Sequence, residues 1–408
     1  MMLRMAREYR VISGDTHLEI DSRQWVHRVP AVHRDRAPRL VRLPDGADAW
    51  LVEGQPLREV PMDLYAGKGR DVWHPWGQSY ASTAGTGPAE QRVREQERDN
   101  IDAEVLFAGI SHFMWRSIRD DEAYLAIVRA YNEFLAEDYC AMAPDRLLGL
   151  AVIPQTGVED AVRDMELAAR RGLAGVVLAA YPSGKGHPTP EDDRFWAAAL
   201  DLNVPVTVHQ EIPRQAGPLV RLPREPREIV RRMGATIGFA EQLTKFARTG
   251  GFNAIQLVLS GVFDRFPQLK IFFAETQIGW IPFFYEQADL RYERHLHWAS
   301  EAFGFEPLKR GLPSDYMREH CLWGFQYDRV GVELRHRIGV DKLIWATDFP
   351  HQESEWPNSL AVIERNFQGV PDDERRLMIR DNAVRFFHLE ARSADGAPRS
   401  VQAEPSLA

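Results

Sequence analysis

The chain has 408 residues, of which 44% are hydrophobic and 27% are charged, as in an ordinary globular protein with one large domain or two smaller ones. Its formal net charge of −9 argues against a surface that binds nucleic acid or anionic membranes. No stretch reaches the roughly 20 apolar residues of a membrane span, and the charged N-terminus lacks the apolar core of a signal peptide, so we expect a cytoplasmic protein.

Short apolar runs alternate with amphipathic stretches of helical length, which is the pattern of parallel βαβ units. Eight runs are predicted as strands: Arg10–Asp15, Ala103–Phe107, Leu147–Ile153, Ala174–Ala180, Val204–Val208, Ile271–Glu275, His320–Gly324 and Leu343–Thr347. The predicted helices are Asp120–Ala143, Val158–Arg171, Asp192–Leu202, Phe239–Thr249, Gly279–Trp298, Glu353–Phe367 and Asp372–Phe387. This count predicts one (β/α)8 TIM barrel over residues 1–390, with its active site at the C-terminal ends of the strands. A doubly wound sheet is the alternative, but no glycine-rich phosphate loop follows the first strand.

A long insertion, residues 24–100, separates the first two predicted strands and breaks the alternation. It is rich in Arg, Pro, Trp and Gly, and we expect it to form a lid or a subunit contact. Its aromatic side chains, Trp76 and Tyr80 among them, could wall a pocket for a planar substrate or join two subunits of a homodimer. The small, polar residues 391–408 are predicted to be a disordered tail.

Acidic and imidazole side chains end three of the apolar runs. The first run ends in Asp15 and His17, the fifth in His209, and the last in Asp348. Alternate residues of a strand point to the same face, so Asp15 and His17 could bind one ion together. Each residue alone is weak evidence, because an Asp often caps a helix or forms a turn. Together, at matching strand ends, they predict one metal site.

Carboxylate and imidazole ligands suit one divalent ion, zinc or manganese above all, with a coordination position left for water or substrate. Thiolate ligation is excluded, because the only cysteines, Cys140 and Cys321, lack a metal-binding spacing and are expected to be buried and reduced. A second register would use His17 and Glu19 in place of Asp15 and His17. Asp15 directly ends the apolar run, which favours the first register.

Three stretches are specific enough to indicate a family: GVFDRFP at residues 261–267, ETQIGWIP at 275–282 and ATDFPH at 346–351. With them the chain resembles the amidohydrolase-related branch that includes aminocarboxymuconate-semialdehyde, γ-resorcylate and 5-carboxyvanillate decarboxylases. The resemblance runs from the first strand to residues 382–387 and is weak across the insertion. It implies a distorted metal-dependent barrel, often dimeric, with zinc or manganese held by Asp15, His17, His209 and Asp348.

The chain departs from that family at two positions. Many members carry His-x-His at the first strand, where this chain has Asp15-Thr16-His17. The decarboxylases usually carry a catalytic histidine at the sixth strand, where this chain has Glu275. A carboxylate differs from an imidazole in charge and pKa. Glu275 could relay a proton, hydrogen-bond a phenol, orient His209 or pair with an arginine.

Two chemistries fit these residues. In non-oxidative decarboxylation of a small carboxylated aromatic or enol-type substrate, the metal orients the carboxylate and Asp348 delivers a proton. In hydrolysis of a C–N, ester or C–C bond, Asp348 accepts and returns the proton of a metal-activated water. We place decarboxylation ahead of hydrolysis, and a catalytically silent barrel that serves as a binding subunit is the third hypothesis. The expected catalytic residues are Asp348, Glu275 and His209, and the expected substrate contacts are His351, Trp115, Trp76 and Glu19.

Overall fold

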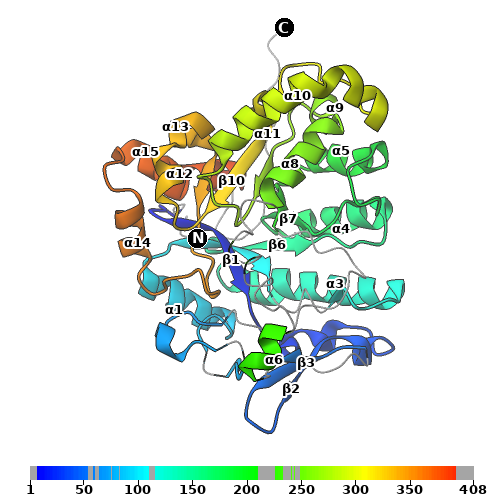
Figure 1. Cartoon of the computed structure of the whole chain (residues 1–408). Coiled ribbons are helices and arrows are strands. Elements are labelled where there is room, and N and C mark those ends of the chain that lie inside the picture. The colour runs from blue at the N-terminus through cyan, green and yellow to red at the C-terminus, as the bar shows by residue number, and fades with distance from the viewer. Residues whose placement is uncertain are drawn as a thin grey trace, which may run out of the picture.

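The computed structural model describes residues 7–53, 58–59, 64–74, 76–81, 83–109, 115–209, 226–232, 240, 243 and 249–391. Eight strands, each paired in parallel with its neighbours, form one sheet in the order β1-β5-β6-β7-β8-β9-β10-β11 (Figure 1). Their bounds are β1 Ile12–Leu18, β5 Ala103–Ala108, β6 Leu147–Val152, β7 Gly175–Leu178, β8 Val206–Val208, β9 Ile271–Phe273, β10 Cys321–Phe325 and β11 Leu343–Trp345. Each coincides with a predicted strand, so the TIM-barrel prediction is confirmed.

The sheet closes because its two edge strands, β1 and β11, meet. The backbone N–H of Asp348 donates to the carbonyl of Asp15 at 3.0 Å, and that of His17 donates to Phe349 at 2.8 Å. A side chain at Gly14 would not fit there, because its Cβ would lie 2.3 Å from a methyl carbon of Ile344. Glycine at this position therefore allows the close approach that joins the first strand to the last.

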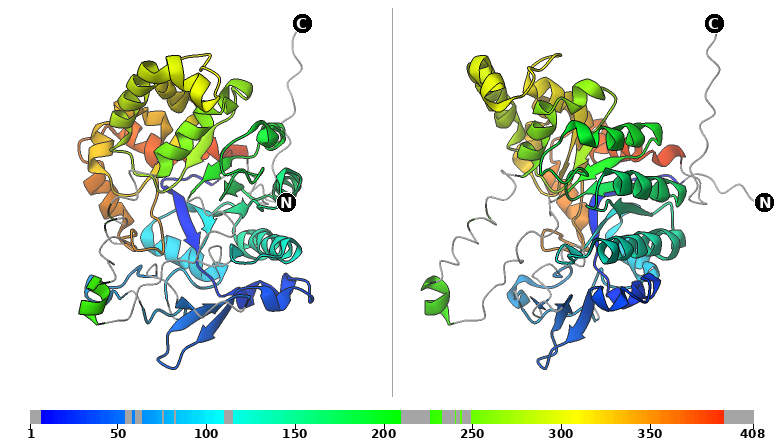
Figure 2. Two further views of the ribbon diagram at one scale, coloured as in Figure 1. Left: turned by 45° about the vertical axis from the view of Figure 1, so that its right-hand side comes forward. Right: turned by 90° about the vertical axis from the view of Figure 1, so that its right-hand side faces the viewer.

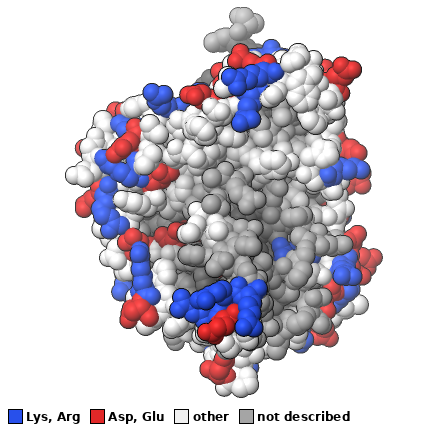
Figure 3. Space-filling view, in the orientation of Figure 1, with Lys and Arg blue, Asp and Glu red and all other residues white. Residues whose placement is uncertain are grey.

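The strands read as continuous apolar runs because they are buried on both faces, as parallel barrel strands must be. All residues of β6 and β7 are buried, and the core cluster extends through the barrel and under the surrounding helices. Figure 2 shows the helices lying outside the strands. On the face shown in Figure 3, Lys and Arg are interspersed with Asp and Glu. Cys140 and Cys321 are buried, as predicted, and form no disulfide within the described part of the chain.

Some helices of the described chain follow predicted ones with shifted ends, and others were not predicted. Their bounds are α1 Ala89–Asp99, α3 Asp121–Phe134, α4 Val158–Arg170, α5 Asp193–Asp201, α6 Arg227–Arg232, α8 Thr249–Leu259, α9 Val262–Arg265, α10 Ile281–Phe303, α11 Pro313–His320, α12 Arg329–Glu333, α13 Arg335–Ile338, α14 Ser359–Asn366, α15 Asp372–Arg376 and α16 Asn382–Phe386. The helices without a predicted counterpart include α1, α8, α9 and α11 to α13. Most of the helix predicted at 239–249 lies outside the described residues. No helix in the described part of the chain is both long and apolar enough to span a bilayer.

The insertion has a small antiparallel sheet of its own. It consists of β2 Arg39–Arg42, β3 Asp48–Leu51 and β4 Arg58–Glu59. Figure 1 shows β2 and β3 below the barrel, past the end of β1. The insertion then ends in α1, which returns the chain to β5. Of the predicted tail, residues 391–408, all but residue 391 lie outside the described residues.

Trp115, predicted to line a substrate pocket, lies in the hydrophobic core instead. Its ring is fully buried and makes edge-on contacts with Trp25 at 5.8 Å and Tyr131 at 4.9 Å between ring centroids. The sequence pattern could not separate these two environments, because an aromatic residue after a strand suits either one. In the structure, the side chain of Trp115 packs among core residues.

We expect Trp115→Ala to lower the free energy of unfolding by about 3 to 5 kcal/mol, because it empties a large buried volume. Urea denaturation measures this loss. Phe283→Ala is the matched control, since Phe283 is 70% exposed and its loss should change stability by no more than about 0.5 kcal/mol. Full stability of Trp115→Ala with loss of activity would instead return Trp115 to a substrate pocket.

Candidate metal centre

Four predicted ligands come together where the strands end. Asp15 and His17 lie on β1, His209 directly follows β8, and Asp348 lies three residues after β11. The Nε2 atom of His17 is 3.6 Å from Oδ1 of Asp15 and 3.1 Å from Oδ1 of Asp348. The Nε2 atom of His209 is 3.4 Å from Oδ2 of Asp15. Donor atoms that share one ion through bonds of about 2.0 to 2.2 Å lie about 3.0 to 3.5 Å apart.

The same four side chains carry buried polar atoms without a hydrogen-bond partner. These atoms are both carboxylate oxygens of Asp15 and Asp348, both ring nitrogens of His17, and Nε2 of His209. A buried polar atom that lacks a partner costs about 1 to 3 kcal/mol, and a charged one costs more. A divalent cation bound among them would satisfy several of these atoms at once, so these residues fit the ion that the sequence predicts.

The electrostatics of the cluster also suit a cation. Burial lowers the pKa of His209, but the facing carboxylate of Asp15, together with Glu275 and Asp348, outweighs burial and raises it. Burial raises the pKa of Asp348, but His351 and His17 outweigh it and lower that pKa. Asp348 is therefore ionised, which is the state in which a carboxylate binds metal.

Local backbone features aim these side chains. The pairing of β1 with β5 shifts register between Ser13 and Thr16, a bulge-like irregularity next to Asp15. Asp348 has a left-handed backbone with φ of 54°, which is uncommon for a residue with a side chain. Two backbone hydrogen bonds hold this conformation. The N–H of Asp348 donates to the carbonyl of Asp15, and the N–H of His351 donates to the carbonyl of Asp348. Such strained residues cluster at functional sites.

Comparison with known proteins identifies the family of this chain. Residues 27–389 match the Amidohydrolase family. The chain belongs to the amidohydrolase family. The γ-resorcylate decarboxylase of Rhizobium radiobacter is 26% identical to it over 319 residues, which cover 74% of this chain and 88% of the relative.

Solved structures share the fold of this amidohydrolase. An amidohydrolase from Mycobacterium avium subsp. paratuberculosis has a TM-score of 0.68 at 18% identity and covers 94% of this chain and 100% of its own. A dihydroxybenzoic acid decarboxylase from Polaromonas, with bound manganese and the inhibitor 2-nitroresorcinol, has a TM-score of 0.62 at 18% identity. That match covers 95% of this chain and 99% of the decarboxylase.

A second layer of polar groups lies beside Asp348 in this amidohydrolase. His351 stacks on His17 with ring centroids 3.8 Å apart, and its Nδ1 is 3.2 Å from Asp348 Oδ1. On its other side, Nε2 of His351 is 3.1 Å from Glu19 Oε1. Tyr80 donates its hydroxyl to Oε2 of Glu19 at 3.1 Å. The sequence predicted Glu19 and His351 near the site, but their contact with each other and with Tyr80 was not predicted.

Two sets of side chains are spaced for one ion within the described residues. One contains Asp15, His17 and His209, and the other contains His17, Asp348 and His351. Glu19 belongs to neither set and faces His351 instead, so the geometry favours the register that uses Asp15 and His17. His351, predicted to contact substrate, is within reach of the ion as well.

Trp76, predicted to contact substrate, belongs to the insertion. It is 37% exposed. The neighbouring Trp73 stacks on Tyr65 at 4.7 Å within the insertion. The substrate contact at Trp76 stays a prediction.

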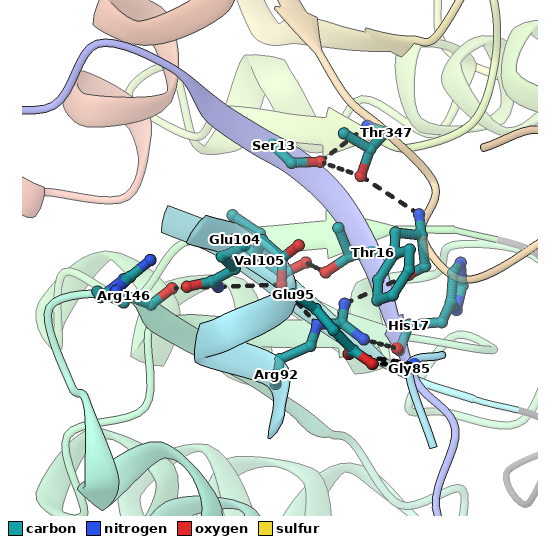
Figure 4. Close-up of polar contacts among 12 residues, drawn as sticks. Ser13, Thr16, His17, Gly85, Arg92, Glu95, Glu104, Val105, Arg146 and Thr347 are labelled. Carbon is teal, nitrogen blue, oxygen red and sulfur yellow. Dashed lines mark hydrogen bonds and ion pairs between the residues drawn. The ribbon is translucent and has the colours of Figure 1, made fainter. Parts of the chain in front are cut away.

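Arg92 on α1 is a buried residue that sequence reasoning missed (Figure 4). Its Nε donates to Glu104 on β5 at 2.6 Å. Its Nη1 donates to the carbonyl of His17 at 3.1 Å, and its Nη2 to that of Phe349 at 3.3 Å. One guanidinium thus ties both sides of the β1–β11 junction, because its planar fork offers several donors at fixed angles.

We expect Arg92→Met to lower the free energy of unfolding by about 3 to 5 kcal/mol, because Glu104 is left as an uncompensated buried charge. The double variant Arg92→Met with Glu104→Leu removes both charges and should recover most of that stability in urea denaturation. Its metal affinity should stay lower than that of the wild type, because the junction between His17 and Asp348 is no longer held. Wild-type metal affinity in the double variant would contradict this positioning role.

Proposed function

We propose that this protein is a metal-dependent non-oxidative decarboxylase of a small carboxylated aromatic or enol-type molecule. The observation that carries the proposal is the four-ligand cluster with its buried, unsatisfied polar atoms, found in a chain that matches 88% of the length of a γ-resorcylate decarboxylase. The departure at Glu275 does not remove any of these four ligands. We include a homodimer, a cytoplasmic location and an insertion that serves as lid or subunit contact in the proposal.

The bound divalent ion, manganese or zinc, would orient the substrate carboxylate and a neighbouring oxygen. Asp348, ionised in the free protein, takes the proton of the substrate's phenol and delivers it to the ring carbon that bears the carboxylate. The bond between that carbon and the carboxylate then breaks, carbon dioxide leaves, and the bonding electrons restore the aromatic ring. The phenolate product recovers its proton from water, so that one proton is consumed for each carbon dioxide released.

His351, stacked on His17, supports this role of Asp348 by contacting the same carboxylate oxygen. It lies between Asp348 and Glu19 and is 14% exposed, so it is placed to hold the carboxylate in one orientation while substrate binds. Orientation of a proton donor contributes to the rate because the reacting atoms must approach within hydrogen-bond distance.

Hydrolysis remains the second candidate, and Glu275 is the observation that favours it. The carboxylate of Glu275 lies 3.4 Å from Nε2 of His209, where the resemblance implies a histidine in decarboxylases. In a hydrolase, Asp348 would accept a proton from the attacking water and return it to the leaving group. Both reactions use the same ligands, so the products must separate them.

The deciding experiment is product analysis on protein loaded with Mn²⁺. We expect carbon dioxide release from 2,6-dihydroxybenzoate or another hydroxybenzoate, and in D₂O one deuterium at the former carboxyl position. Asp348→Asn should reduce this turnover by at least about 10²-fold, and His209→Ala should lose both metal and activity. Incorporation of ¹⁸O from labelled water without carbon dioxide would establish hydrolysis. Full metal loading with neither reaction across carboxylated aromatics, esters and amides would favour the binding-subunit hypothesis.

A further inference from the structure

We propose that Tyr80 of the insertion is a positioning residue of the metal centre. Its hydroxyl fixes Glu19, and Glu19 fixes the imidazole of His351 beside Asp348. The inference rests on the metal centre, and its consequence for turnover rests on the proposed function. It gives Tyr80 a role different from the pocket wall or the subunit contact that the sequence left open.

The insertion holds Tyr80 in one place. The residue is 7% exposed. Its backbone N–H donates to Oδ2 of Asp48 at 2.8 Å, and its carbonyl accepts a hydrogen bond from Oγ1 of Thr86 at 2.7 Å. Its ring meets that of Trp50 edge-on, with the centroids 5.8 Å apart. Asp48 and Trp50 both belong to β3, so the small sheet of the insertion sets where the hydroxyl of Tyr80 lies.

The hydroxyl of Tyr80 and the imidazole of His351 contact different oxygens of one carboxylate. Tyr80 donates to Oε2 of Glu19 at 3.1 Å, and Oε1 of Glu19 is 3.1 Å from Nε2 of His351. The two oxygens of a carboxylate are fixed relative to each other, so a donor on Oε2 restricts where Oε1 can lie. Burial and then the charge of Glu19 raise the pKa of Tyr80, so its hydroxyl keeps the proton that it donates.

His351 passes this restraint to the metal centre. Its Nδ1 is 3.2 Å from Oδ1 of Asp348, the oxygen that also lies 3.1 Å from Nε2 of His17. Groups that contact a metal ligand in this way orient it, and the loss of one typically costs about 10- to 100-fold in metal affinity or activity. His351 is also spaced to share an ion with His17 and Asp348. Its orientation therefore matters to the site both as a partner of Asp348 and as a neighbour of the ion.

The insertion also packs directly against the segment after β11 that carries the metal-centre residues. Ala66 N–H donates to the carbonyl of Pro350 at 3.4 Å. A Cβ at Gly85 would lie 2.5 Å from Pro350, and one at Gly67 would lie 2.7 Å from the ring of Trp356. The insertion and this segment are therefore fixed relative to each other by packing, so the loss of one hydroxyl between them does not separate the two.

Bound Co²⁺ tests the role of Tyr80 without any substrate, because its visible absorption depends on the geometry of the ligands around the ion. Protein is stripped with a chelator and titrated with Co²⁺, and both the spectrum and the affinity are measured. We expect Tyr80→Phe to change the spectrum and to weaken binding by about three- to tenfold, at or below the lower end of the effect of losing a group that contacts a metal ligand. Glu19→Gln, which interrupts the contacts one step nearer to His351, should do the same.

The matched control is Tyr285→Phe. Tyr285 is 1% exposed, and its hydroxyl accepts a hydrogen bond from Nε1 of Trp323 at 3.3 Å. Both substitutions remove the hydroxyl of a buried tyrosine, so both should lower the thermal midpoint of the metal-free protein by similar, small amounts. Only Tyr80→Phe should change the Co²⁺ spectrum, because Tyr285 lies on α10 and faces Trp323 instead of Glu19.

A double substitution separates positioning from a general loss of stability. Because the effect of Tyr80 reaches the ion through His351, Tyr80→Phe should change Co²⁺ affinity by less than about twofold when His351→Ala is already present. A merely structural effect would weaken binding by the same factor with and without His351.

Turnover gives a second measure in the active enzyme. Tyr80→Phe should lower kcat by about tenfold and leave KM within about twofold of wild type, because it disturbs the proton donor and not the binding of substrate. A rise in KM with kcat and the Co²⁺ spectrum unchanged would assign Tyr80 to the substrate pocket and overturn the positioning role.

The outcomes separate this proposal from the proposed function. An unchanged Co²⁺ spectrum and affinity in Tyr80→Phe, or equal weakening with and without His351, overturns this role of Tyr80 and leaves the metal centre and the decarboxylase intact. Wild-type protein that binds no Co²⁺, Mn²⁺ or Zn²⁺ overturns the metal centre and this proposal together. A Co²⁺ site that depends on Tyr80, without carbon dioxide release, supports the positioning role and removes only the decarboxylase.

Discussion

The junction between the first and last strands of the barrel governs the rest of the structure. Asp15 and His17 come from one side of it and Asp348 from the other, so the distance between these ligands depends on how the two strands meet. Two backbone hydrogen bonds, a glycine at residue 14 and the guanidinium of Arg92 set that distance. The metal centre is therefore built into the closure of the barrel. Loops elsewhere in the chain can vary without moving these three ligands.

The barrel, and the approach of the four candidate ligands to one another, could be predicted from the sequence for one physical reason. Strands buried on both faces must be apolar, so a polar or charged residue at the end of such a run is noticeable, and the C-terminal ends of parallel strands meet at one edge. Asp15, His17, His209 and Asp348 satisfy that rule. Nothing comparable distinguishes Trp115, because the core and a pocket demand the same side chain.

Other features could not be predicted from the sequence because they depend on tertiary contacts. Arg92 occurs in a helix rich in Arg, Glu and Gln, whose pattern is that of a solvated surface, yet the side chain is only 1% exposed. The connection from Tyr80 through Glu19 to His351 joins the insertion, the end of β1 and the segment after β11. Its members are too far apart in sequence for spacing to relate them. For the same reason, the orientation of Glu275 toward Nε2 of His209 required coordinates.

The hydroxyl groups of Ser13 and Thr347 lie 3.0 Å apart at the strand junction, although 334 positions separate the two residues in sequence. Contacts of such long range form late, because the entropy of closing the intervening chain must be overcome first. A ribosome must release nearly the whole polypeptide before Asp348 can join Asp15. The candidate ligands of the first and last strands can therefore come together only once nearly the whole polypeptide has been made.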